Sequence, residues 1–201
     1  MKVRILNPFI AACMMMATLW MAPQFASAAD DTVLLVEEPQ SNSTYSGVTN
    51  LRGWAVSVNG IDRIELLVDG TFFTNIPSGA LRPDVGNAFP TYPKSGNSGF
   101  SMAFNYSNLS PGQHTLTIRA VDTLGNAKVQ TVTLFTVRFD VPNNFLDDAT
   151  KVSLIGTTLG IGPNGRSISI KNMQVDGKSY NVLLDWSTPM QGFAITQLAA
   201  P

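Results

Sequence analysis

Alternation of apolar and polar residues runs through the chain from about residue 33, and it limits the fold more than any other feature. In one segment Ile64, Leu66 and Val68 alternate with charged neighbours. A period of two places one side of a strand on a core and the other side in water. Since no convincing helical period accompanies it, the sequence predicts an all-β protein.

Segments of this kind recur up to residue 139, separated by turns rich in Gly, Asn and Asp. The seven strands expected from them cover residues 33–36, 51–58, 63–69, 72–73, 100–105, 115–120 and 125–139. Short strands at this spacing are typical of an immunoglobulin-like β-sandwich. Asn59-Gly60 favours a tight hairpin, whereas in that topology its two flanking strands lie in opposite sheets, so their pairing is left open.

The longest stretch expected to lack strands is residues 77–98, which holds four prolines and three glycines. Proline has no backbone donor and is rarely found in central strands. Long loops inside a compact domain are often functional or are ordered by their own contacts.

The remaining chain is expected to form a small C-terminal antiparallel β-meander. Its strands are predicted at 152–159, 168–175, 180–186 and 193–196, with hairpin turns at Asn164-Gly165 and Asp176-Gly177. A meander of about fifty residues is marginal alone, so docking on the sandwich or on another protein is expected. The predicted divisions are a signal peptide at 1–28, the sandwich at 30–139, a linker at 140–149 and the small domain at 150–198.

The N-terminus has the order of a removable export signal: Lys2 and Arg4, then an apolar run, then Ala26-Ser27-Ala28. Cleavage is expected after Ala28, which places the protein in the periplasm or outside the cell without a membrane span. A retained anchor is the alternative, although Asn7 and Pro8 shorten the apolar run. Cys13 also ends a lipobox-like sequence, but the apolar run continues past it.

The processed chain would carry 11 basic and 14 acidic residues, because Lys2 and Arg4 leave with the signal, and its formal net charge is then −3. That balance gives no electrostatic argument for nucleic acid or anionic membranes as partners. Cys13 is the sole cysteine of the sequence, so disulfides within the processed chain are excluded and packing must stabilise the fold.

Several short motifs occur in a fixed order between residues 33 and 137. They are Gly53-Trp54-Ala55, Gly60-Ile61, Val68-Asp69-Gly70, Arg82-Pro83-Asp84-Val85, Ser98-Gly99-Phe100, Pro111-Gly112-Gln113-His114-Thr115-Leu116 and the run from Asp122 to Gly125. This set resembles the bacterial Ig-like domains of exported and cell-surface proteins. The resemblance implies a spacer, an adhesion unit or an appendage of an enzyme, and a fold does not fix a function. The tail from Lys151 matches no recognised family, although residues 175–180 look like short β-repeats of other secreted bacterial proteins.

The long loop holds the candidate ligand-binding residues Arg82, Asp84, Phe89 and Tyr92. Arg82 and Asp84 either contact a ligand or clamp the loop. Phe89 and Tyr92 either stack on a sugar or partner, or cover the sandwich edge. Trp54 and Trp186 each lie on an apolar strand face and are expected in cores.

The sequence offers no catalytic or metal-binding set. His114 is the single histidine, and no G-x-S-x-G elbow accompanies it. The aspartates form no D-x-D-x-D-G calcium loop. We therefore expect no cofactor and no metal, and predict a non-catalytic binding or structural module with a protein or cell-surface polysaccharide as partner. The alternatives are a carbohydrate-binding accessory domain that uses the 77–98 loop and an unrecognised hydrolase.

Overall fold

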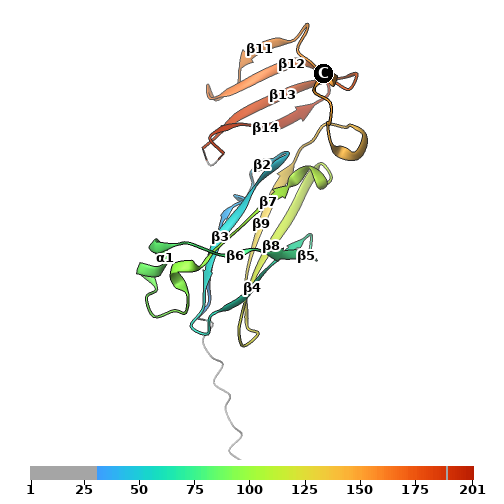
Figure 1. Cartoon of the computed structure of the whole chain (residues 1–201). Coiled ribbons are helices and arrows are strands. Elements are labelled where there is room, and N and C mark those ends of the chain that lie inside the picture. Colours follow the sequence, from blue (N-terminus) through green and yellow to red (C-terminus); the bar gives the residue numbers. More distant parts are fainter. Residues whose placement is uncertain (1–30, 189) are drawn as a thin grey trace, which may run out of the picture.

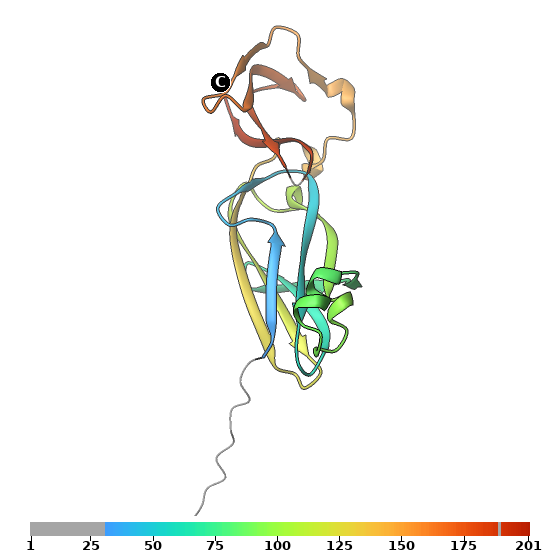
Figure 2. The same ribbon diagram turned by 90° about the vertical axis from the view of Figure 1, so that its left-hand side faces the viewer.

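The computed structural model describes residues 31–188 and 190–201 (Figure 1). The predicted signal peptide, its cleavage site and Cys13 lie outside the described residues. Within them, the strands form three sheets, and two of these sheets face each other to make a β-sandwich. The third sheet stands at one end of the sandwich (Figures 1 and 2).

The first sheet has the strand order β1-β3-β7-β6 and is antiparallel throughout. Its strands are β1 (Val33–Glu38), β3 (Val48–Val56), β7 (Gly99–Asn105) and β6 (Ser78–Ala80). The facing sheet has the order β2-β9-β8-β4-β5, and only β2 runs parallel to its neighbour. It is made of β2 (Thr44–Tyr45), β9 (Ala127–Thr136), β8 (Gly112–Asp122), β4 (Ile61–Val68) and β5 (Thr71–Ile76).

The all-β prediction and the immunoglobulin-like sandwich are confirmed. Strands β3 and β4 lie in different sheets, so the Asn59-Gly60 turn carries the chain across the sandwich and does not close a hairpin. The turn is closed by a hydrogen bond from the Gly60 amide to the Ser57 carbonyl.

The core lies between the two sheets and is built from alternate residues of their strands. Its buried members are Val36, Leu51, Ala55, Ile64, Leu66, Ile76, Phe100, Phe104, Tyr106, Leu116, Ile118, Ala120, Val132 and Leu134. Gly53 is required here, because a Cβ at this position would lie 2.6 Å from the Phe100 ring and 2.1 Å from the Leu35 carbonyl oxygen. The absence of a side chain at position 53 therefore leaves the space that the Phe100 ring fills in the core.

The sequence analysis predicted that residues 77–98 lack strands, but this stretch contains regular structure. It contains β6, the short helix α1 (Pro83–Ala88) and the 3-10 turn η1 (Ser95–Asn97). A second 3-10 turn, η2 (Tyr106–Asn108), joins β7 to β8.

The C-terminal sheet has the order β10-β12-β13-β14, with β11 also paired to β12. After η3 (Pro142–Asn144) and η4 (Ala149–Lys151) come β10 (Val152–Ser153), β11 (Thr158–Ile161), β12 (Ser167–Val175), β13 (Lys178–Ser187) and β14 (Gly192–Ala199). The single strand expected at 152–159 is two strands, because the chain turns between them with a Thr157-to-Leu154 backbone hydrogen bond. Both predicted hairpin turns are present.

The two tryptophans do not occupy the cores expected for them. Leu51 and Ala55 take the inward positions of β3, so Trp54 points to the opposite, outer side of the first sheet. Trp186 stands near the end of β13 with 49% of its surface exposed.

Candidate functional site

The 77–98 loop folds onto one side of the sandwich, where its short helix lies beside the first sheet (Figure 2). Pro83 is the first helical residue, where its missing N–H costs nothing. Val85 is buried under the helix, and the Arg82 amide donates to the Gly96 carbonyl across the loop at 2.7 Å. A Cβ at Gly86 would lie 2.9 Å from the Gly96 Cα, so the two arms of the loop pack too closely at this point to admit a side chain at position 86.

Arg82 ties this loop to itself and to the sheet. Its Nε and Nη2 donate to the two carboxylate oxygens of Asp84 at 3.0 and 2.7 Å, and its Nη1 lies 3.0 Å from Glu37 Oε1. The Arg82 guanidinium is the main cause that lowers the pKa of Asp84 to about 2. This geometry is that of a clamp: a planar fork that joins the loop to strand β1.

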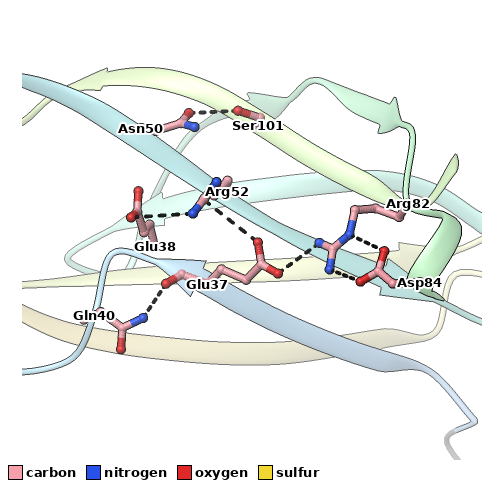
Figure 3. A network of polar contacts seen from close by, with 8 residues as sticks. All are labelled: Glu37, Glu38, Gln40, Asn50, Arg52, Arg82, Asp84 and Ser101. Atoms are coloured by element: carbon pink, nitrogen blue, oxygen red, sulfur yellow. Dashed lines mark hydrogen bonds and ion pairs between the residues drawn. The ribbon is translucent and has the colours of Figure 1, made fainter. Parts of the chain in front are cut away.

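Glu37 lies between two guanidinium groups, as Figure 3 shows. On its other side Arg52 Nε is 3.9 Å from Glu37 Oε2, and Arg52 Nη2 is 3.9 Å from Glu38 Oε1. The long contacts and the 46% exposure of the Arg52 side chain leave its donors accessible. Asn50 and Ser101 continue the polar row with a 2.8 Å hydrogen bond between their side chains.

These groups line a groove of about 350 Å³ on the outer side of the first sheet. Its walls include Glu37, Asn50, Arg52, Arg82 and Ser101. We call it the outer-face groove. The sequence analysis identified Arg82 as a site residue but missed Glu37, Arg52 and Ser101. The signal that could have identified them is their position on the sides of the strands that face away from the core.

Phe89 and Tyr92 do not join the charged network. Their rings pack edge to face at 5.3 Å, and Phe89 also contacts Trp54 at 5.8 Å. All three rings are half-buried. The loop aromatics therefore cover the outer side of the sheet around Trp54 while part of each ring still faces solvent.

His114 forms a triad-like arrangement with Asp69 and Ser110. Its Nδ1 is 2.7 Å from Asp69 Oδ2, and its Nε2 is 2.8 Å from the Ser110 carbonyl oxygen and 3.2 Å from Ser110 Oγ. Burial of the ring lowers its pKa, but the hydrogen bonds to Asp69 and the Ser110 carbonyl outweigh this effect, so the pKa of His114 is raised. A ring that donates from both nitrogens holds no lone pair for a serine proton. The contacts agree with a turn residue satisfied locally.

Within the part of the chain that the structure describes, no group of three or more His, Cys, Asp or Glu residues is arranged to hold a metal ion. Over the same residues, no helix has both the length and the apolar character needed to cross a bilayer.

Comparison with known proteins gives one family match. Residues 33–118 match the family model described as bacterial Ig domain. No curated protein matches the chain.

Similar solved structures share 9–11% identity with the chain. The endo-beta-1,4-mannanase from Thermotoga petrophila aligns over 54% of this chain and 20% of its own, with 11% identity and a TM-score of 0.40. The fibronectin(III)-like modules of Clostridium thermocellum CbhA align over 52% and 94%, with 9% identity and a TM-score of 0.34. Dimeric latent PorU from Porphyromonas gingivalis aligns over 89% and 21%, with 10% identity and a TM-score of 0.39. The chain thus spans about a fifth of the mannanase and PorU chains.

Proposed function

We propose, on the premise that residues 33–118 are a bacterial Ig domain, that this chain is a non-catalytic interaction module of the bacterial envelope or extracellular space. Domains of this kind occur in surface or exported proteins. In this proposal the chain is exported by the signal at residues 1–28 and binds a protein partner through the outer-face groove. The loop residues Arg82, Asp84, Phe89 and Tyr92 form one rim of the binding surface.

The observation that carries the proposal is the ordered, accessible row of charges in the groove. Arg82 is held by Asp84 and Glu37, so its position is fixed before any partner arrives. Fixing polar groups in advance reduces the entropy lost on binding. Arg52, in contrast, lies 3.9 Å from its two carboxylate partners among the described residues and can turn its fork toward a partner's carboxylate or amide carbonyl.

The charges of the groove favour a protein segment over an anionic polymer. Two guanidiniums stand beside three carboxylates, those of Glu37, Glu38 and Asp84, so a uniformly negative ligand would meet repulsion as well as attraction. A partner with mixed polar and acidic side chains can pair with both signs.

The experiment compares purified wild-type protein with Arg52→Gln in co-sedimentation with envelope fractions of the source bacterium. The matched control is Lys171→Gln, which removes one positive charge from an exposed position on the C-terminal sheet. We expect Arg52→Gln to lose at least about tenfold in retention, while the control keeps it. Equal retention of all three proteins, or none by the wild type, would refute the proposal.

A carbohydrate partner held by the loop is the second candidate, because the half-buried Phe89 and Tyr92 rings still offer part of their surface. A glycan array tests it with wild-type protein and Tyr92→Ala. Retention on a glycan that Tyr92→Ala abolishes would replace the protein partner by a polysaccharide, and retention unaffected by the change would exclude the loop as its site.

A further inference from the structure

A second cavity lies between the end of the sandwich and the C-terminal sheet, where β2 and β14 lie against each other (Figure 1). Its volume is about 330 Å³, within the range of small-molecule sites. Tyr45 and Thr49 of the sandwich line one side, and Asp185, Trp186 and Thr196 of the C-terminal sheet line the other. We call it the junction cavity. It shares no lining residue with the outer-face groove.

The walls are rich in hydroxyl groups and carry little charge. Among the described residues that line the cavity there is no lysine or arginine, which disfavours an anionic ligand. Asp185 is the one carboxylate, and it accepts hydrogen bonds from Ser167, Thr196 and Asn164. Hydrogen bonds from Ser167 and Thr196 lower the pKa of Asp185, so this carboxylate stays ionised. Its oxygens already accept hydrogen bonds from neighbouring side chains. These walls suit a neutral ligand.

The sandwich side of the cavity is lined mainly by polar side chains, among them Ser43, Thr44 and Ser46. Their hydroxyl groups can donate to a ligand and accept from it, whereas the Thr49 Oγ1 is shielded from solvent.

Trp186 supplies the other half of a recognition surface. Its ring packs edge to face on Phe193 at 5.4 Å, yet 49% of the residue is exposed, and it lines the cavity. A sugar ring presents C–H groups on its faces and hydroxyls around its edge, so it can cover an indole and hydrogen-bond hydroxyl walls together.

We propose that the junction cavity binds a neutral saccharide, with one ring stacked on the indole of Trp186 and its hydroxyls hydrogen-bonded to the hydroxyl groups of the walls. The inference stands apart from the proposed function, since the two sites share no residue. It also differs from sugar binding by the 77–98 loop, which would depend on Tyr92.

The test titrates the full chain with hexasaccharides of glucose, mannose and N-acetylglucosamine by calorimetry, and follows the indole N–H signals by NMR. We expect one of the three probes to bind and to shift the Trp186 signal. Trp186→Ala should weaken binding at least about tenfold, whereas Trp54→Phe and Tyr92→Ala should leave it unchanged.

The inference is overturned if no probe binds at up to about 10 mM, or if binding survives Trp186→Ala.

Discussion

The hydrogen bonds of His114 to Asp69 and to the Ser110 carbonyl give the sharpest test of how this sandwich is stabilised. Replacing His114 by Gln removes one of two donors, because the imidazolium donates from Nδ1 to Asp69 and from Nε2 to the Ser110 carbonyl. We expect the free energy of unfolding to fall, and the fall to depend on pH. Since His114 is the sole histidine of the sequence, few other groups titrate in the same range.

The magnitude follows from the geometry and the exposure. A hydrogen bond to a charged group contributes about 1.5–3 kcal/mol in a buried setting. The Asp69 side chain is 50% exposed, so solvent screening reduces the contribution to about 1 kcal/mol.

The sign follows from the direction of the two pKa shifts. The pKa of His114 is raised, so its stabilisation is complete below the ordinary value of 6.5 and is lost as pH rises through the folded-state pKa. Burial raises the pKa of Asp69, but hydrogen bonds from Thr115 and His114 outweigh this and lower it. Its stabilisation is therefore lost as pH falls from 3.8 through its lower folded-state value.

Urea denaturation of wild-type protein and His114→Gln at about pH 5 and about pH 9 measures the effect. The wild-type advantage should be about 1 kcal/mol larger at the lower pH. Ser110→Ala is the control, because it keeps the carbonyl acceptor and should change stability by less than about 0.5 kcal/mol. An equal advantage at both pH values, or a larger one at the higher pH, would show that protonated His114 does not stabilise the fold through its two hydrogen bonds.

Three further outcomes are expected. Phe100→Ala should lower the free energy of unfolding by about 3–5 kcal/mol, because the ring is 1% exposed in the inter-sheet core; a loss below about 1 kcal/mol in urea denaturation would contradict that core. Gly86→Ala should speed proteolytic cleavage within residues 81–98, whereas Gly96→Ala, which has open space at its Cβ, should not; equal rates would count against the tight packing of the loop. Lys178→Ala breaks the ion pair and the backbone hydrogen bond to Asp140 and should speed cleavage within 140–149, while Lys178→Arg should not; an unchanged rate for Lys178→Ala would show that this contact does not hold the linker.

The strands could be predicted because their alternation is local. In β4, Ile64, Leu66 and Val68 recur at every second position and pack in or against the core, and Asp69-Gly70 supplies the turn into β5. The helix α1 was missed because its six residues include Pro83 and Gly86 and carry no apolar period.

Alternation shows which residues share a side of a strand, but not which side meets the core. In β3 the bulky Trp54 suggested an inward side, whereas the smaller Leu51 and Ala55 occupy it and belong to the same core cluster as Phe100. The partners of Trp54 come from the 77–98 loop, more than thirty residues away in sequence, so no local pattern reveals them.

The charged row escaped prediction for the same reason. Glu37, Arg52 and Arg82 belong to three segments that are distant in sequence. They become neighbours only once β1 pairs with β3 and the 77–98 loop folds against the first sheet. The junction cavity likewise depends on how the C-terminal sheet meets β2. The proposed divisions at 139/140 and 149/150 remain predictions.

The most direct test of a binding role for the outer-face groove is site-specific photo-crosslinking in the source bacterium. One probe replaces Ser101, an exposed residue of the groove, and the other replaces Thr131, an exposed residue on the outer side of the facing sheet. A discrete protein adduct from position 101 that is absent from position 131 is the result this account predicts. Adducts of equal yield from both positions, or none from position 101, would contradict it.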